Sequence, residues 1–188
     1  MSDGWYSREK LEQMGFQSLG EDVQISTKTS IYGASHMRIG SHVRIDDFCL
    51  LVGNITLGNH IHIAAYTGIH ASLGSFTMGD FTGVSSHCTF YTASSDYSGM
   101  TLSNPTVPEK YKREFSSDMY IGRHCLFGAN ALFLPGANLP DGVAVGAMSM
   151  VNKPLEAWSI YAGVPVKKIK ERSKRCLELE KQLLEEYT

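Results

Sequence analysis

Histidine and aspartate side chains are the groups of this sequence that could move a proton during a reaction. The chain has seven histidines, and imidazole is the side chain that titrates closest to neutral pH. His62 lies in the stretch HIHIAAY, His70 follows an isoleucine of a regular apolar pattern, and Asp96 lies in the polar stretch SSDYSG. A general base needs a pKa near the operating pH. We therefore treat His62, His70 and Asp96 as candidate catalytic residues.

Simpler explanations exist for several of these positions. An exposed turn would account for His70, and an Asx turn would account for Asp96. In RIDDFC, Asp46 suits a tight turn, whereas Asp47 is freer to face an acceptor. The candidate substrate-binding residues are Asp47, Tyr97 and His87. Solvated turns are expected for the remaining histidines, His36, His42, His60 and His124.

The elements that must position these residues are indicated by an apolar residue at every sixth position. The pattern runs without a break from Ile39 to Ile69, resumes from Met78 to Phe90, and runs again from Ile121 to Val151. Strands alternate every second residue and helices repeat about every 3.6 residues, so neither fits. A unit of one short strand and one turn, three units per coil, does fit. The pattern predicts a mainly β fold in which parallel strands stack into a three-sided β-helix.

The appendages of this β-helix can be placed by residue range. Residues 1–20 are expected to form an N-terminal helical cap, with Ser7 as its N-cap. The β-helix is expected over residues 21–157, with a long external loop at 92–119. Aromatic residues in that loop favour an ordered arm that reaches a neighbouring subunit or a substrate. Residues 158–188 are expected to form a C-terminal segment and a charged helix.

Composition argues against several classes of protein. Lys and Arg number 17 against 19 Asp and Glu, and no basic stripe runs through the body, which argues against nucleic acid as a partner. The first residues lack the apolar core of a signal peptide, and no window approaches about 18 uninterrupted apolar residues. We expect a cytoplasmic protein without a membrane span.

The cysteines are expected to be structural. Cys49, Cys88 and Cys125 each fall four residues after a phase residue, in a slot interpreted as a small inward corner that otherwise holds Val43, Ile55, Ile61, Thr67, Ala131, Ala137, Val143 and Ser149. They are therefore interpreted as small buried hydrophobic residues. Cys176 is expected on a helix, and no Cys-x-x-Cys pair indicates a metal site.

The repeats, the long interruption and the closing IYAGVPVKKIKER resemble the left-handed β-helix acyltransferases, such as the galactoside, maltose, serine and xenobiotic acetyltransferases. The left hand comes from this resemblance, because the usual crossover rule favours the opposite hand. The stretches RIDDFC, SSDYSG, NPTVPEKYK and AGVPVKKIKER are most similar to sugar acetyltransferases of bacterial surface-polysaccharide biosynthesis. GDP-perosamine N-acetyltransferase is one such enzyme.

The resemblance implies a homotrimer with active sites between subunits, acetyl-CoA as co-substrate along the coils, and no metal. N-acetylation of a nucleotide-linked amino sugar for O-antigen or another surface polysaccharide is favoured over O-acetylation of a sugar or glycan. A catalytically silent scaffold remains a third possibility. A zinc enzyme of the γ-carbonic anhydrase type would need two histidines five residues apart, and the sequence has no such pair.

The resemblance also bears on individual residues. Galactoside-type members carry a catalytic histidine near the position of Ser95, where this chain has none. His62 is similar to a histidine near the coenzyme in amino-sugar acetyltransferases, and His70 falls where galactoside-type enzymes place an asparagine that contacts the acceptor. For the coenzyme, the resemblance implies small residues along the coils and basic residues at its phosphates, although the basic residues could instead solvate a helix start. The candidate coenzyme-binding residues are Ala129, Ala147, Lys153, Lys167 and Lys168.

Overall fold

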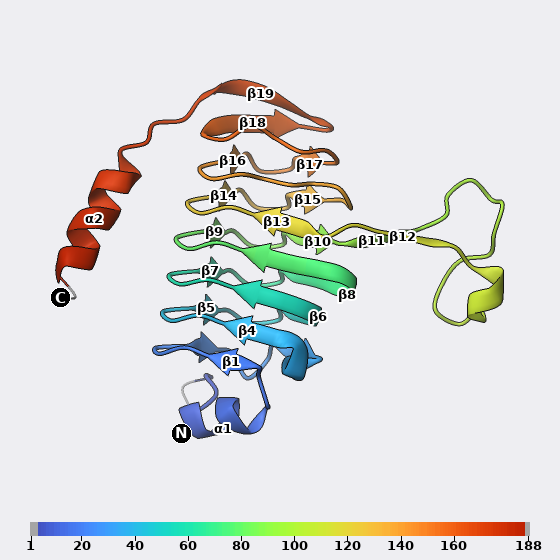
Figure 1. The fold of residues 1–188 in the computed structure, drawn as a ribbon, viewed down its shortest axis with the longest axis horizontal. Coiled ribbons are helices and arrows are strands. Elements are labelled where there is room, and N and C mark those ends of the chain that lie inside the picture. Colours follow the sequence, from blue (N-terminus) through green and yellow to red (C-terminus); the bar gives the residue numbers. More distant parts are fainter. Residues whose placement is uncertain (1–3, 187–188) are drawn as a thin grey trace.

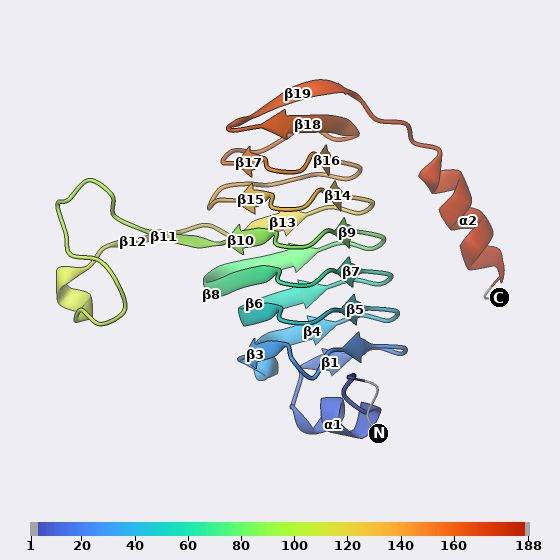
Figure 2. The same ribbon diagram turned by 180° about the vertical axis from the view of Figure 1, so that it is seen from behind.

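The computed structural model describes residues 4–186, which form a prism of stacked coils (Figure 1). Each coil contributes a short strand to each of three faces, and most strands pair in parallel with the strand one coil above or below. The predicted fold class is therefore confirmed. A hairpin arm and the C-terminal helix project on opposite sides of the prism (Figures 1 and 2).

Each face is a ladder of strands, and we call the faces A, B and C in the order in which the chain visits them. Face A contains β1 (Ser18–Leu19), β4 (Met37–Ile39), β13 (Met119–Ile121) and the second halves of β6 (Leu50–Leu57) and β8 (Gly68–Met78). Face B contains β2 (Gln24–Ile25), β5 (Arg44–Ile45), β7 (His62–Ile63), β9 (Gly83–Val84), β14 (Leu126–Phe127), β16 (Ala144–Val145), β18 (Ser159–Gly163) and β19 (Val166–Glu171). Face C contains β3 (Ser30–Tyr32), the first halves of β6 and β8, β10 (Thr89–Tyr91), β15 (Leu132–Phe133) and β17 (Met150–Val151).

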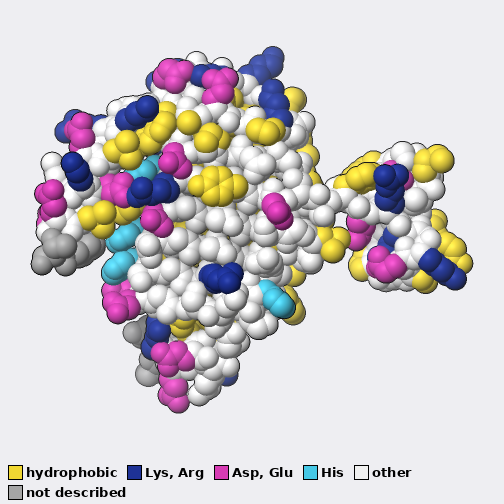
Figure 3. All heavy atoms as spheres, in the orientation of Figure 1, with side chains coloured by type: hydrophobic (Ala, Val, Ile, Leu, Met, Phe, Trp, Pro, Cys, Tyr) yellow, Lys and Arg dark blue, Asp and Glu magenta, His cyan; other side chains and the backbone are white. Residues whose placement is uncertain are grey.

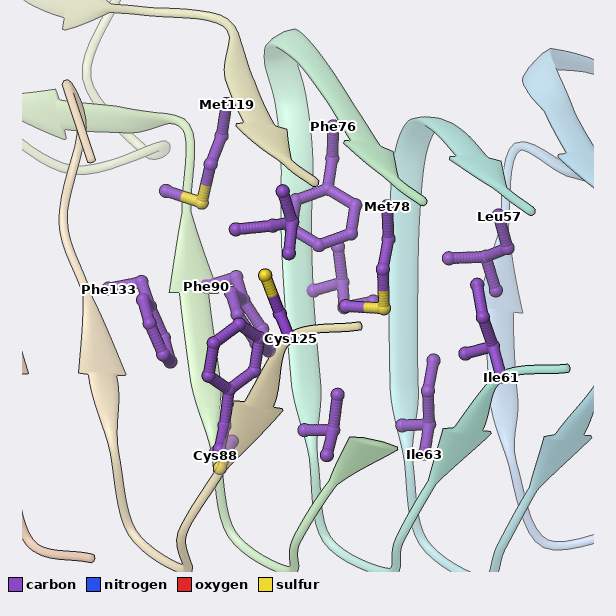
Figure 4. Close-up of a cluster of buried hydrophobic side chains, with 14 of the residues drawn as sticks. Leu57, Ile61, Ile63, Phe76, Met78, Cys88, Phe90, Met119, Cys125 and Phe133 are labelled. Atoms are coloured by element: carbon purple, nitrogen blue, oxygen red, sulfur yellow. The ribbon is translucent and has the colours of Figure 1, made fainter. Parts of the chain in front are cut away.

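The residues of the six-residue pattern line the inside of the prism. Every one of them is buried, from Ile39 at 2 % exposure to Val151 at 0 %. Figure 4 shows members of this set, among them Ile63 and Met78, converging between the faces. Stacking continues from coil to coil, as where Phe90 lies on Phe133 with 4.4 Å between ring centroids. Each buried side chain thus packs mainly against its counterparts in the next coils.

The three cysteines predicted to be inward are buried. Cys49, Cys88 and Cys125 have exposures of 2 %, 0 % and 1 %. Burial raises the pKa of the Cys49 and Cys88 thiols to about 11 and that of Cys125 to about 12. Cys176 begins helix α2 (Cys176–Glu186) and is partly exposed.

Aromatic and histidine rings stack along the prism's corners, where the backbone turns through left-handed conformations. At the corner between faces A and B, His42 stacks on His60 with 4.6 Å between centroids, and His60 stacks on Phe81 at the same spacing. Histidine side chains gather along the side that faces α2 (Figure 3). His124 continues this column but is only 6 % exposed, because Glu180 of α2 covers it. The expectation of a solvated turn was therefore wrong for His124.

The ends of the prism are closed by different elements. Helix α1 (Arg8–Gln13) lies below the first coil, and the side chain of Ser7 accepts a hydrogen bond from the Lys10 amide, as its predicted N-cap role requires. At the other end β18 and β19 form an antiparallel pair, so residues 158–188 contribute strands as well as α2. No helix among residues 4–186 is long and apolar enough to cross a bilayer.

The expected external loop is an ordered arm. Strands β11 (Ala93–Ser95) and β12 (Glu114–Ser116) pair antiparallel and carry a tip that contains the 3-10 helix Glu109–Tyr111. A second 3-10 helix, Ala34–His36, precedes β4.

Candidate active site on face B

A histidine and a carboxylate from adjacent coils meet on face B. Parallel pairing of β5 with β7 places Arg44 beside His62. His62 Nε2 lies 2.8 Å from Asp46 Oδ2, and Arg44 Nε donates a 2.7 Å hydrogen bond to Asp46 Oδ1. The His62 side chain is half exposed, whereas that of Asp46 is 20 % exposed. A polar network at the surface therefore holds the imidazole.

The charge of Asp46 fixes the hydrogen-bonding role of His62. Burial acts to raise the pKa of the Asp46 carboxyl, but hydrogen bonds from Arg44 and His62 outweigh it and lower that pKa below its usual value of 3.8. Asp46 is thus ionised at neutral pH and accepts the hydrogen bond. A neutral His62 then carries its proton on Nε2 and keeps a lone pair on Nδ1. Nδ1 is the atom that can accept a proton.

A hollow of about 260 Å³ lies beside His62. Two hydroxyl side chains, Ser85 and Ser86, line it together with the apolar side chain of Leu126. Sequence reasoning missed both serines. The signal was available, because each follows a phase residue, Val84, one coil above the HIHIAAY stretch. The full lining is His62, Ala64, Gly83, Val84, Ser85, Ser86 and Leu126.

A stripe of small residues rises along face B from this hollow. Backbone hydrogen bonds link its members coil by coil, as from the Ser85 amide to the Phe127 carbonyl and from the Gly128 amide to the Val145 carbonyl. Gly128 is required here, because a Cβ would lie 2.4 Å from the Ala147 nitrogen. Four strand-to-strand steps of about 4.8 Å make the stripe roughly 19 Å long. Its members, which we call the small-residue stripe, are Ala64, Ser85, Gly128, Gly146 and Ala162, flanked by the predicted coenzyme residues Ala129 and Ala147.

A groove of about 370 Å³ at the upper end of the prism is lined by the predicted coenzyme lysines Lys153, Lys167 and Lys168. Lys167 pairs with Ala162, so its side chain shares the outward face of the small-residue stripe. Lys168 pairs with Tyr161 instead. The Lys168 ammonium contacts Glu156 at 2.7 Å and Glu171 at 2.6 Å, and these carboxylates raise the pKa of Lys168. The structure therefore gives the two neighbouring lysines different surroundings.

His70 lies on a different face from His62. It belongs to β8 on face C, stacks on Tyr91 with 4.6 Å between centroids, and has its pKa lowered by burial. Tyr91 lines a groove of about 520 Å³ at the base of the arm, together with Tyr97. Its remaining lining residues are Ala93, Ser94, Ser95, Leu132, Leu134 and Pro135. Within one chain, the structure does not bring His70 to the His62 hollow.

The predicted acidic residues Asp96 and Asp47 already have hydrogen-bond partners. Asp96 lies on the arm and accepts hydrogen bonds from the Ser98 amide at 2.8 Å and the Thr101 hydroxyl at 3.2 Å. These bonds lower the pKa of Asp96. Asp47 accepts a bond from the Ser26 hydroxyl and pairs with Lys28 at 2.6 Å. Asp96 therefore orders a local turn of the arm, whereas Asp47 ties its coil to residues about 20 positions earlier in the chain.

The other predicted substrate contacts are ring side chains. Tyr97 is 94 % exposed on the arm, and His87 stacks on Tyr66 at the corner between faces B and C with 4.7 Å between centroids. Among residues 4–186, no three histidine, cysteine or acidic side chains are grouped so that they could hold a metal ion.

Comparison with known proteins places this geometry in a family. No family model matches the sequence. A dTDP-4-amino-4,6-dideoxy-D-glucose acyltransferase of Escherichia coli is 42 % identical over 174 residues, which are 91 % of this chain and 90 % of that protein. A putative lipopolysaccharide biosynthesis O-acetyl transferase of E. coli K12, WbbJ, is 30 % identical over 75 % of this chain and 71 % of its own length.

Solved structures of acyltransferases are also similar to this chain. AntD, an N-acyltransferase of Bacillus cereus, superimposes with a TM-score of 0.94 in its complex with dTDP and 3-hydroxybutyryl-CoA, at 44 % identity and with 98 % of each chain covered. A variant of AntD in complex with dTDP-4-amino-4,6-dideoxyglucose and coenzyme A gives a TM-score of 0.95 at 43 % identity, covering 99 % of this chain and all of the other. By sequence and by fold, the chain belongs to the left-handed β-helix, hexapeptide-repeat family of sugar acyltransferases.

Proposed function

We propose that this protein transfers an acyl group from a coenzyme A thioester to the amino group of a dTDP-linked 4-amino-4,6-dideoxy sugar. The observation that carries the proposal is the His62 hollow at the foot of the small-residue stripe. It occurs in a chain that shares 42 % identity, over nearly its whole length, with an acyltransferase named for this sugar nucleotide. The acyl donor is thus a broader class than the acetyl-CoA expected from the sequence, and acetyl-CoA is one member of it.

The stripe suits the coenzyme because it is long and has little side-chain bulk. Pantetheine can lie against Gly128 and Gly146 with Ala129 and Ala147 at its side. Lys167, at the upper end, would then face the phosphates as a positive charge. The thioester end reaches Ser85 and the hollow.

In this geometry His62 receives the proton that the acceptor amine must lose. The amine nitrogen attacks the thioester carbonyl carbon, a carbon–nitrogen bond forms, and the carbon–sulfur bond breaks. The proton passes from nitrogen to His62 Nδ1 and then to the leaving thiolate. In the proposed reaction the hydroxyls of Ser85 and Ser86 donate hydrogen bonds to the carbonyl oxygen as its negative charge grows. Asp46 keeps the imidazole oriented throughout.

We further propose a homotrimer in which the arm completes the neighbouring subunit's site. Support comes from face C, whose outward side chains include Tyr32 and Tyr91 at 62 % and 37 % exposure. The arm projects from the edge of that face (Figure 1). Asp96, Tyr97 and His70 would then contact the acceptor from another chain. We place the reaction in the cytoplasm and in surface-polysaccharide biosynthesis, in keeping with the similarity to WbbJ.

A direct assay tests the proposed function. Purified protein is incubated with acetyl-CoA or 3-hydroxybutyryl-CoA and dTDP-4-amino-4,6-dideoxyglucose, and both free thiol and the acylated sugar nucleotide are measured. The expected result is equal release of thiol and formation of an amide product. The dTDP-linked 6-deoxyglucose, which has a hydroxyl in place of the amine, tests O-acylation. Turnover of the hydroxyl compound alone, or of GDP-linked and UDP-linked amino sugars alone, would overturn the proposal.

A further inference from the structure

The hollow beside His62 exists because one residue of a column has no side chain. Strand pairing stacks an outward-facing column on face B, and within it Gly83 is the neighbour of both His62 and Leu126. The other members carry side chains. From bottom to top the column of parallel strands is Gln24, Arg44, His62, Gly83, Leu126, Ala144 and Ile160.

The backbone at Gly83 does not require glycine. Its φ is not among the positive values that favour glycine, and a Cβ built there would meet only Leu126 Cδ1, at 3.2 Å. That atom ends a flexible side chain that is 50 % exposed. At position 128, by contrast, only glycine fits, because a Cβ would overlap the neighbouring backbone. Glycine at position 83 of strand β9 therefore leaves space on the surface and is not required by the backbone.

The walls of the hollow differ in chemistry. Leu126 and Ala64 present apolar surface, whereas His62, Ser85 and Ser86 present hydrogen-bonding groups. A volume of about 260 Å³ is below the roughly 300–1,000 Å³ of sites that enclose a drug-sized ligand. A sugar nucleotide is too large for it. A short alkyl chain attached to a carbonyl matches both the size of the hollow and its mixture of apolar and hydrogen-bonding lining residues.

We propose that this hollow receives the acyl chain of the donor and that Gly83, with Leu126 above it, sets the chain length that the enzyme accepts. The inference rests on the proposed function and adds a determinant of donor specificity. A side chain at residue 83 would fill the space beyond the carbonyl carbon. Loss of the Leu126 side chain would extend the space upward along face B.

The test measures kcat/KM for acetyl-, butyryl-, 3-hydroxybutyryl- and hexanoyl-CoA with one fixed amino-sugar acceptor. Each methylene in an apolar pocket changes specificity by about 10-fold or more. In Gly83→Val, the ratio of kcat/KM for butyryl-CoA to that for acetyl-CoA should fall at least about 10-fold, with Gly83→Ala intermediate. In Leu126→Ala, the ratio for hexanoyl-CoA to butyryl-CoA should rise. Thr77→Val replaces a hydroxyl with a methyl group at an outward position on face A and should leave every ratio unchanged.

The outcomes separate this inference from the proposed function. If the unaltered protein does not acylate the amino sugar with any of the four thioesters, the proposed function fails. If it is active, but Gly83→Ala and Leu126→Ala both keep its chain-length ratios, the hollow does not hold the acyl chain. A raised KM for the sugar nucleotide at constant chain-length ratios would assign the hollow to the acceptor and overturn the inference. Circular dichroism checks folding, and the Ala variants carry the test if Gly83→Val does not fold.

Discussion

His62 Nε2 lies 2.8 Å from the carboxylate oxygen Oδ2 of Asp46, a residue sixteen positions earlier in the chain and one coil below it. This pair joins a group that can take up a proton to a group that orients it. It lies beside a hollow with two hydroxyl groups, at the foot of the small-residue stripe. The relationship depends on stacking, because the two residues belong to different repeats.

Replacing either member of this pair should slow catalysis. His62→Gln removes the proton acceptor and should lower kcat by about 100-fold or more. Asp46→Asn can turn the imidazole to the other tautomer, so kcat should fall by about 10-fold or more with little change in KM. Steady-state kinetics at several pH values measure both effects. His36→Gln, at an exposed position, is the control, and wild-type kcat in both His62→Gln and Asp46→Asn would refute the assignment.

The two lysines at the upper end should respond differently to substitution. Lys167→Ala should raise the KM for the thioester about 10-fold, because a hydrogen bond to a phosphate oxygen is lost. The effect should shrink at high salt, which screens exposed charges. Lys168→Ala should have a smaller effect on KM, since its ammonium pairs with Glu156 and Glu171. Equal increases in KM for both variants would contradict this distinction.

Thiol reactivity should report the packing of the cysteines. At pH 8 a disulfide reagent should modify Cys176 in the folded protein and leave the other three intact, because burial raises the pKa values of Cys49 and Cys88 to about 11 and that of Cys125 to about 12. All four should react in denaturant. Mass spectrometry of peptides identifies the modified residues, and Cys176→Ser should abolish the fast reaction. Fast modification of Cys88 in the folded state would contradict the inward placement.

Stability should decrease at mildly acidic pH because of His70. Burial lowers its pKa in the folded state below the usual 6.5, so the unfolded chain binds its proton more readily. The contribution of His70 to the unfolding free energy is complete above pH 6.5, and it is lost as the pH falls through the folded-state pKa of His70. The unfolding free energy, measured with denaturant at pH 7.5 and 5.5, should therefore fall less in His70→Gln than in the wild type. His36→Gln should keep the wild-type difference, and identical losses in His70→Gln and wild type would exclude this role.

Much of the fold could be predicted because every six-residue unit has the same pattern of inward and outward residues. Ile63 and Phe127 recur at the same phase and are both buried. The slot of Cys125 could be assigned in the same way, from aliphatic or small residues at equivalent positions, such as Val43 and Ala131. The surroundings of individual site residues could not be predicted in this way, because a turn histidine such as His124 can be exposed or covered by a helix distant in the sequence.

The sequence by itself determined which side chains point into the prism and which point out, since that depends only on position within each repeat. It also placed His62 among the outward residues and the arm outside the coils. Only the tertiary structure decided which outward residues are neighbours. Insertions before Met78 and Ile121 change the number of residues between adjacent coils, so Gly83 meets His62 and Leu126 only through the register of strand pairing. That register follows from backbone hydrogen bonds and from packing along the whole stack, which no single repeat specifies.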